Sequence, residues 1–505
     1  MATYEAATPT KVGLRRDAIG LREVLFQSVT DMAPGAAIAA SIPAGAAFAG
    51  GSLPLSVVFA LVACLLCAWC VGELARELPA AGSLATYAAR GLHPWLGFLV
   101  AWAYVTVGAL IPPLVLLQLG FTVAATMHSE LGVTASLWWP WTIIGALLVG
   151  AAGYFGIQVS ARLGTILGVF EILVFLVLGV FFVVHAGSAN TGQVFTTHYT
   201  PKSYAGITGV IAGSVYTVLA FGGFEGAAPL AEEARDPRRT VRRAVLLATL
   251  LIGLLYVFTT YSVTTVFGPA RFGNFSTSGS SSWEGLARSL YGVFWFFVFL
   301  AIVNSTIANS NAGVNVASRT AYAMGRVRAF PSVFAVVSEH YRSPLVALGT
   351  TIAITLGVSL GLGFGYGPTT AFAMVGAGLV ILLVSVYIVT DAACIAYFAR
   401  ARRLRLVAHG LIPVLGILAF IPAWLTATGI HVFSFISPLT PPISYMAYGI
   451  GGFMALGVVY LALLWRRDRQ RVIDVGIVHL DLPEEAEAPA KAETEPPGYG
   501  YDPPR

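Results

Sequence analysis

Long apolar stretches recur along most of the chain, and short polar segments separate them. A helix that crosses the hydrocarbon core of a bilayer needs about 20 mostly apolar residues, and about twelve stretches meet that length. The third and eighth are the longest, so we expect those helices to tilt or to extend past the membrane. The pattern predicts an all-α membrane protein with spans at 25–50, 54–76, 95–126, 137–158, 163–186, 206–231, 243–268, 288–318, 345–365, 370–399, 406–428 and 444–465.

The composition agrees with a chain whose surface faces lipid. Apolar residues make up 57% of the chain and charged residues 10%, whereas soluble domains usually carry about 25% charged residues. The net charge is +5, but the basic residues lie at predicted helix ends rather than in one stripe. We therefore predict the lipid bilayer as a partner and no nucleic acid. The polar first twenty-odd residues lack the pattern of a signal peptide.

Arginine and lysine concentrate in alternate connecting segments, which indicates the orientation of the chain. With a cytoplasmic N-terminus, the inside segments hold most basic residues, and the outside segments keep only Lys202, Arg271 and Arg288. We predict the inner (cytoplasmic) membrane, with both termini in the cytoplasm. The predicted parts are a cytoplasmic segment 1–24, a transporter core 25–400, two additional helices at 401–466, and a disordered cytoplasmic tail at 467–505, which is rich in Pro, Glu and Ala.

Three of the four cysteines form the run Cys64, Cys67 and Cys70, whose spacing is superficially similar to a metal-binding run. They lie within one apolar predicted helix, and no other cysteine or histidine clusters with them in the sequence. Small apolar residues on one helical stripe are the simpler interpretation. We predict no metal, no cofactor and no disulfide framework.

Two predicted helices are interrupted by glycine and proline at membrane depth. The first contains APGAA at 33–37, and the sixth contains FGGFEG at 221–226. Because lipid cannot satisfy freed backbone groups, such breaks are tolerated mainly where they line a cavity. Each break falls in the first helix of a possible five-helix unit, about 25–186 and 206–400, and five is odd, so the two units would have opposite topology.

Paired interruptions of this kind indicate the central site of a transporter. The half-helix N-termini at the breaks offer free N–H groups to an anionic group of the substrate. The alternative is that glycine and proline merely ease helix packing, as they often do in membrane helices.

Four segments carry a resemblance to a known family. They are the second predicted helix with its following loop (49–83), the start of the third helix at Gly97, Phe98 and Trp102, the stretch 221–240, and the stretch 318–326. On these segments the chain resembles the amino acid–polyamine–organocation superfamily of permeases, and bacterial amino acid permeases in particular. The resemblance implies a 5+5 inverted repeat with broken helices 1 and 6 plus two extra C-terminal helices. It also implies alternating access.

The resemblance further implies where the substrate binds. The first break lacks the glycine-rich form common in the family, and Leu219 stands where some members carry an aromatic gate. Many relatives place a sodium-mimicking lysine in the fifth helix, and the corresponding position here is Glu171. The implied substrate cradle consists of Pro34, Gly35, Ala36, Ala37, Ile38, Phe221, Gly222, Gly223, Phe224 and Glu225.

Polar residues within the predicted spans are further candidates. A charge at the bilayer centre costs about 2.5–3.5 kcal/mol on insertion scales, so the isolated Glu171 is interpreted as the group that couples transport to protons. A neutral, hydrogen-bonded packing residue is the alternative. Glu225 either supports the broken sixth helix or contacts substrate, and Tyr104 either stacks on substrate or packs in the core. Asp31 and Asp391 are more consistent with gate or packing partners than with substrate ligands.

Asparagines in the eighth predicted helix form a second candidate group. Asn304, Asn311 and Asn315 follow spacings of seven and four, and with Ser318 they make one polar helix face. We expect this face to line the transport path, with Asn304 and Asn311 in contact with substrate. Hydrogen bonding between helices is the alternative.

The function that fits best is a secondary active transporter of amino acids or related amines, with the proton as coupling ion and a small molecule as partner. The alternatives are an exchanger of amino acids or polyamines and a carrier of another small organic metabolite. An enzyme would need a nucleophile–base pair or a metal cluster at membrane depth, and the histidines fall in loops or near span ends. The chain has no Walker sequence for ATP hydrolysis. A channel, a sensor or a scaffold fits the paired breaks less well.

Overall fold

The protein is described by a computed structural model that covers residues 19–80, 82–155, 161–232, 234–326, 330–338, 341 and 343–473. Within these ranges the secondary structure is helical, and extended pairing is limited to an isolated bridge between Ile19 and Ala234. Ten helical stretches of the described chain are long and apolar enough to cross a membrane. Their main helices are α4 (Leu53–Glu77), α6 (Pro94–Leu131), α8 (Ala161–Ala186), α9 (Ile207–Phe221), α10 (Pro237–Phe267), α12 (Phe294–Arg326), α13 (Leu345–Tyr366), α14 (Pro368–Arg400), α15 (Ile412–Thr428) and α16 (Tyr445–Arg467).

Two further segments complete the set of predicted spans. Helix α7 (Trp139–Phe155) is apolar but shorter than the others. The first span is divided into α1 (Leu21–Met32), α2 (Pro34–Ala36), the π-helix η1 (Ala37–Ser41), η2 (Pro43–Gly45) and α3 (Ala46–Ala49). The predicted all-α membrane fold is confirmed.

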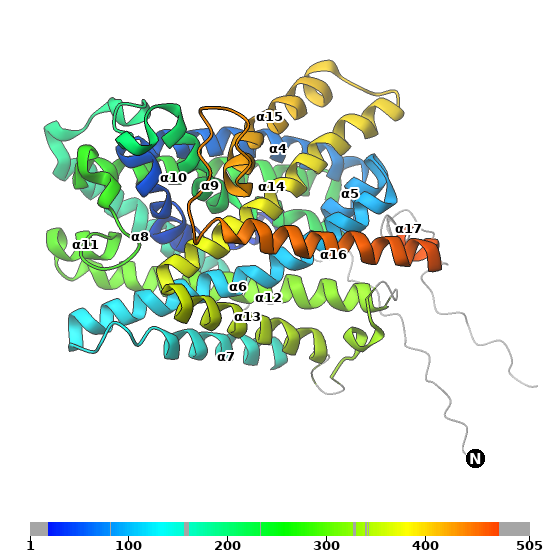
Figure 1. Ribbon diagram of the computed structural model, residues 1–505, viewed down its shortest axis with the longest axis horizontal. Coiled ribbons are helices and arrows are strands. Elements are labelled where there is room, and N and C mark those ends of the chain that lie inside the picture. Colours follow the sequence, from blue (N-terminus) through cyan, green and yellow to red (C-terminus); the bar gives the residue numbers. More distant parts are fainter. Residues whose placement is uncertain are drawn as a thin grey trace, which may run out of the picture.

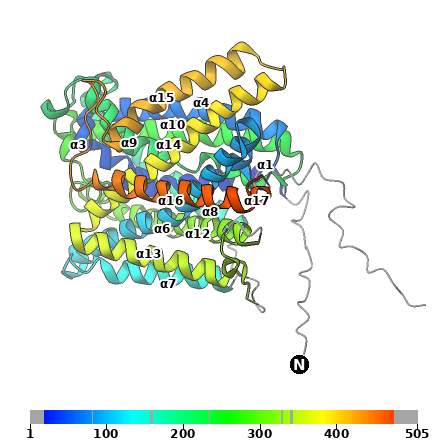
Figure 2. The same ribbon diagram turned by 45° about the vertical axis from the view of Figure 1, so that its right-hand side comes forward.

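Both views show how the long helices are arranged. Helices α7 and α13 lie side by side along one edge of the molecule, and α4 and α15 lie along the opposite edge (Figure 1; Figure 2). Helix α6 packs against α12 and α14, and α4 packs against α10. Large apolar side chains are exposed on the outer helices, for example Leu147 on α7, Val184 on α8 and Leu463 on α16. An apolar surface of this extent suits a lipid-facing exterior.

Several boundaries differ from the prediction. The eighth span was predicted at 288–318, but α11 (Trp283–Tyr291) is a separate helix and α12 begins only at Phe294. Gly292 has a φ of +55°, a backbone conformation that ends α11 and redirects the chain. The loop after α4 contains a short helix, α5 (Ser83–Gly91). Helix α6 continues past its two internal prolines and has 38 residues.

The C-terminal segment and the short turns complete the described chain. Helix α17 (Arg469–Ile473) lies within the segment 467–505 that was predicted to be disordered, and residues 474–505 lie outside the described residues. Most of the predicted N-terminal segment 1–24 also lies outside them. The short helical turns are η3 (Gly50–Ser52), η4 (Gly187–Ala189), η5 (Gly192–Phe195), η6 (Lys202–Tyr204), η7 (Phe224–Glu232), η8 (Pro269–Asn274), η9 (Ser332–Ala335) and the π-helix η10 (Leu406–Leu411).

Candidate functional site

The break in the first span lies at Ala33, between α1 and α2. Ala33 has φ 45° and ψ 65°, a left-handed conformation that is uncommon for a residue with a side chain. A break frees backbone carbonyls, and at membrane depth these need new partners. Side chains from three other helices supply them. Tyr256 of α10 donates to the Met32 carbonyl (3.1 Å), Gln118 of α6 to the Ala36 carbonyl (3.0 Å), and Asn309 of α12 to the Asp31 carbonyl (2.8 Å).

Glu171 of α8 lies directly against the same break. A methyl group placed on Gly35 would lie 2.8 Å from Glu171 Oε2 and 3.1 Å from the Ala301 carbonyl oxygen. The Glu171 carboxyl interacts with the Gly35 backbone N–H and with the Ser305 hydroxyl. These contacts are looser than full hydrogen bonds, because Glu171 Oε2 and Ser305 Oγ each lack a partner with hydrogen-bond geometry. A buried carboxyl therefore sits at the N-terminal end of the half-helix that follows the break.

The break in the sixth span lies between α9 and η7. Gly223 has a φ of +105°, which a glycine adopts easily and other residues do not. Two residues later, Glu225 turns its carboxylate back on the break. Its Oε2 accepts from the Gly223 N–H (3.3 Å) and from the Tyr387 hydroxyl of α14 (2.9 Å), and its Oε1 accepts from the Tyr104 hydroxyl of α6 (3.2 Å). Both carboxylate oxygens of this buried group are thus hydrogen-bonded.

The two interrupted spans are joined to each other. The Ser28 hydroxyl of α1 donates to the Phe224 carbonyl (2.8 Å) and accepts from the Ala227 N–H (3.0 Å). Two glycines permit this close approach. A methyl group on Gly223 would lie 2.6 Å from the Asp31 carbonyl oxygen, and one on Gly226 would overlap Asp31 Oδ2. Helix α1 is therefore in direct contact with the sixth span at Ser28 and Asp31.

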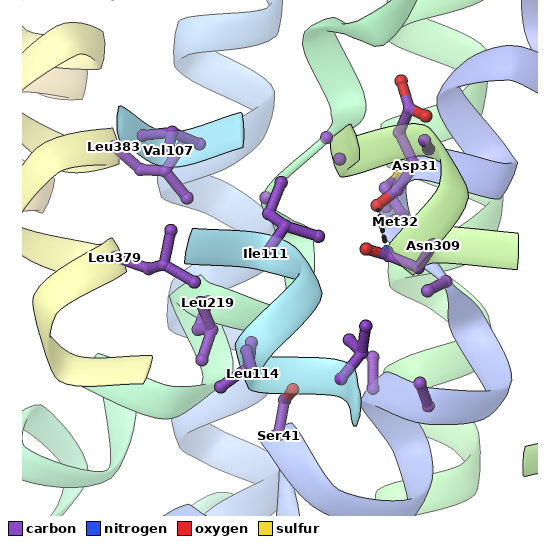
Figure 3. Close-up of a pocket in the computed structure, with 18 of the residues that line it drawn as sticks. Asp31, Met32, Ser41, Val107, Ile111, Leu114, Leu219, Asn309, Leu379 and Leu383 are labelled. Atoms are coloured by element: carbon purple, nitrogen blue, oxygen red, sulfur yellow. Dashed lines mark hydrogen bonds between the residues drawn. The ribbon is translucent and has the colours of Figure 1, made fainter. Parts of the chain in front are cut away.

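A cavity of about 70 Å³ lies between the two breaks and helices α6, α12 and α14. One water needs about 10–15 Å³ on this measure, so the space suits a small solute. In Figure 3, Val107, Ile111 and Leu114 of α6 face the cavity, Asp31 and Asn309 lie on its far side, and Ser41 lies at its lower end. The lining residues are Asp31, Met32, Ala33, Ala36, Ala37, Ser41, Tyr104, Val107, Ile111, Leu114, Val115, Leu219, Ala220, Gly222, Gly223, Glu225, Asn309, Ala312, Gly313, Val316, Leu379 and Leu383.

Comparison with known proteins places the chain in a family. The family model described as amino acid permease matches residues 23–472. The chain belongs to this family. It is 29% identical over 311 residues to the low-affinity putrescine importer PlaP of Escherichia coli (strain K12), a match that covers 61% of this chain and 66% of the importer. It is 26% identical over 337 residues to the histidine permease HisP of Lactococcus lactis, with 63% of this chain and 66% of that permease covered.

A further relative carries no assigned substrate. An uncharacterized transporter of Mycobacterium tuberculosis is 28% identical over 334 residues, which is 66% of this chain and 71% of that protein. The family resemblance inferred from the sequence is confirmed, and with it the conclusion that this family member is a multi-pass membrane protein and not an enzyme.

The structure brings only part of the predicted cradle to the cavity. Ala36, Ala37, Tyr104, Gly222, Gly223 and Glu225 line the cavity, as does Asp31. The other predicted residues are not among the lining residues. In the first span, Pro34 and Ile38 are buried, and Gly35 faces Glu171. In the sixth span, Phe221 packs on Tyr256 and Phe224 packs on Tyr387. On α12, Asn304 donates to the Leu167 carbonyl of α8 (3.5 Å), and Asn311 does not line the cavity.

Sequence reasoning missed Asn309 and Tyr387. On α12 the cavity-facing residues are Asn309, Ala312, Gly313 and Val316, which follow the spacing i, i+3, i+4, i+7 of one helix face. This face is mostly small and apolar. The prediction of substrate contact was therefore made for the more polar face, which contains Asn304 and Asn311. The small-residue spacing was the signal that could have identified Asn309.

Asp391 of α14 is fully buried but does not line the cavity. Its carboxyl interacts with the thiols of Cys67 and Cys70 on α4, and neither of its oxygens has a partner with hydrogen-bond geometry. A methyl group on Gly416 would lie 2.5 Å from Asp391 Oδ2, so α15 covers the carboxyl closely. This placement fits the packing interpretation of Asp391 better than contact with substrate.

Helix α11 contacts the C-terminal part of α6. Glu284 accepts a hydrogen bond from the Thr126 hydroxyl of α6 (2.9 Å), and Arg288 pairs with Glu130 at the end of α6. Arg288 also lies 4.2 Å from the centre of the Trp295 ring. Burial raises the pKa of Glu284 to about 7, although the bond from Thr126 opposes that shift. The α11 contacts to α6 therefore include a carboxyl that titrates near neutral pH.

Proposed function

We propose that this protein is a secondary active transporter that moves amino acids or related amines across the cytoplasmic membrane by alternating access. The observation that carries the proposal is the cavity between two interrupted helices, with freed backbone and the Glu225 carboxylate at its edge. The family match supports it, as do relatives named for putrescine import and histidine permeation. The basic connecting segments support an orientation with both termini in the cytoplasm.

Alternating access requires the cavity to open to each side in turn, and the bonds at the breaks suggest which parts move together. Ser28 and Asp31 join helix 1 to the sixth span, so these two spans form one unit in the proposed cycle. Bonds from Gln118, Tyr256 and Asn309 hold that unit against α6, α10 and α12. In the proposal, substrate binding in the cavity favours a second conformation, in which some of these hydrogen bonds are replaced by others.

We further propose that Glu171 couples transport to protons. A charged Glu171 attracts the Gly35 N–H and the positive N-terminal end of the half-helix, whereas a protonated Glu171 does so weakly. Loading and release of a proton would thereby bias the position of helix 1. The unpartnered Oε2 atom and the nearby unpartnered Ser305 hydroxyl support this role, since they leave room for a change in bonding.

The test is uptake of a panel of amino acids and amines into proteoliposomes, with pH and sodium gradients applied separately. We expect accumulation with an inward proton gradient, and we expect Glu171→Gln to retain binding but to lose the pH dependence of uptake. Wild-type pH dependence in that variant, or accumulation driven by sodium alone, would contradict the coupling proposal. Uptake that requires internal substrate would instead indicate an exchanger, and uptake of none of the compounds would contradict the transporter proposal.

A further inference from the structure

The cavity has an unusual charge balance for a site that would hold an amino acid. Its lining contains two acids, Asp31 and Glu225, and no lysine, arginine or histidine occurs among the lining residues that the structure describes. The two carboxyls lie close enough for their charges to interact. Within the described chain neither forms an ion pair with a basic side chain. The partners of the two carboxyls are therefore hydrogen-bond donors without a formal charge: the Gln27 amide, the Tyr104 and Tyr387 hydroxyls and the Gly223 N–H.

At each break, one of the backbone N–H groups that would attract a substrate carboxylate is already engaged by a carboxyl of the protein. Free N–H groups at the start of a half-helix are the expected binding point for an anionic group. At the helix-1 break, Glu171 lies against the Gly35 N–H from the side away from the cavity. At the break in the sixth span, Glu225 Oε2 accepts a hydrogen bond from the Gly223 N–H (3.3 Å). A second carboxylate at either break would meet a like charge in a medium of low dielectric constant.

The same groups suit a cation. Glu225 is held by the hydroxyls of Tyr104 and Tyr387, which fix its position without neutralising it, and Tyr104 itself lines the cavity. A buried carboxylate without a cationic partner is costly, and a bound ammonium group would supply that partner. The Asn309 side chain and the Ser41 hydroxyl add polar groups at separate places in the cavity (Figure 3).

The rest of the wall suits a short hydrocarbon chain. Between the polar groups lie Val107, Ile111, Leu114, Leu219, Leu379 and Leu383. Burial against such a wall stabilises methylene groups, whereas an ionised carboxylate against these side chains would lose its hydration without a donor to replace it.

We propose that the cavity selects an aliphatic amine cation that lacks a carboxylate, a short monoamine or diamine, and discriminates against the corresponding amino acid. The proposal rests on the transporter function proposed above and names the substrate class of the same site. In this proposal Glu225 binds the ammonium group of the amine, and Tyr104 positions the Glu225 carboxylate.

The test compares pairs of compounds that differ by a carboxylate: butane-1,4-diamine with ornithine, and pentane-1,5-diamine with lysine. Binding to the purified full-length protein and uptake into proteoliposomes are measured for both members of each pair. We expect each amine to bind at least ten-fold more tightly than its carboxylated partner. Equal or tighter binding of the carboxylated partners, with uptake of those compounds, would overturn the amine assignment and leave the transporter function standing. Uptake of no compound from either pair would overturn both proposals.

Variants test the role of the carboxylate. Glu225→Gln should weaken amine binding at least ten-fold, while the weaker affinity for the carboxylated partners changes less. Tyr104→Phe, which removes one of the hydroxyls on Glu225, should weaken amine binding by a smaller factor and serves if Glu225→Gln does not fold. The matched control is Glu77→Gln, because Glu77 pairs with Arg403 (3.6 Å) and does not line the cavity. Unchanged amine binding in both cavity variants would overturn the assignment to Glu225.

Discussion

The two interrupted spans differ in how the backbone groups freed at their breaks are hydrogen-bonded. In the first span, the freed carbonyls accept hydrogen bonds from side chains of three other helices, namely Tyr256, Gln118 and Asn309. The sixth span carries its own polar group, since Glu225 turns back to the Gly223 N–H two residues earlier. The first span is thus held directly by several separate neighbours, whereas the sixth span depends on two glycines, on Ser28 and on its own carboxylate, which Tyr104 and Tyr387 hold in place.

This difference implies different sensitivities to mutation. Loss of one neighbour at helix 1 removes one of several bonds, and the others remain. At the sixth span a single change can prevent the backbone from reaching its conformation at all. We therefore expect the largest effects of single substitutions at the glycine pair and the smallest at the side chains that hold helix 1.

The largest effect is expected for Gly223→Ala. The φ of +105° is strained for alanine, and the new methyl group would lie 2.6 Å from main-chain atoms of Asp31, which cannot move aside as a flexible side chain can. Such a backbone conformation costs about 1–3 kcal/mol before the steric term is added. We expect little folded protein, a lower apparent Tm in detergent and no uptake.

Gly222→Ala is the matched control in the same motif. Gly222 has a φ of −54°, and a methyl group there would meet the flexible end of Leu383 at 2.9 Å and the Leu219 carbonyl oxygen at 3.1 Å, a tight contact but without the positive φ of Gly223. Its apparent Tm should lie close to that of the wild-type protein. Equal losses of stability in the two variants would show that the conformation of Gly223 is not the reason for the effect.

A smaller loss is expected for Ser28→Ala, which breaks the bridge between the two spans. The variant removes the hydroxyl that bonds both to the Phe224 carbonyl and to the Ala227 N–H, and each such hydrogen bond is worth about 1 kcal/mol. Apparent Tm and uptake rate should both fall. The control is Ser214→Ala, because the Ser214 hydroxyl is equally buried but bonds only within its own helix, to the Ile211 carbonyl. An equal fall in both variants would contradict a bridging role.

Hydrophobicity and the placement of glycine and proline were sufficient to predict the helices and both breaks. Each depends on local chemistry: an apolar run long enough for lipid, and residues that cannot continue a helix. Boundaries were predicted less well where a single backbone conformation decides them. The separation of α11 from α12 depends on Gly292, which looks like any other glycine in an apolar sequence.

The candidate site was only partly predictable, because the rotation of each helix about its axis is set by its neighbours. Glu225 and Tyr104 were identified from position and residue type, and both line the cavity. Asn304 was equally plausible in the sequence, but packing turns it toward α8, while Asn309 on another face of the same helix reaches helix 1. Tyr387 was missed because no feature of its own apolar helix indicates that it meets Glu225.

The smallest effect is expected for Tyr256→Phe at helix 1. The variant removes the hydroxyl that donates to the Met32 carbonyl but keeps the ring and its edge contact with Phe221. One such bond is worth about 1 kcal/mol, so uptake should persist with a slightly lower apparent Tm. Tyr216→Phe is the control, since its hydroxyl makes a longer bond of 3.4 Å to the Ala373 carbonyl, away from the break.

A double variant that combines Tyr256→Phe with Gln118→Leu tests whether the hydrogen bonds to the first span contribute independently to stability. Tyr256 and Gln118 approach the break from α10 and α6 and bond to different carbonyls. If each bond contributes independently, the stability losses of the two single variants should add within about 0.5 kcal/mol in the double variant. A loss well above that sum would mean that helix 1, like the sixth span, depends on one cooperative arrangement, and the contrast between the two breaks would then disappear.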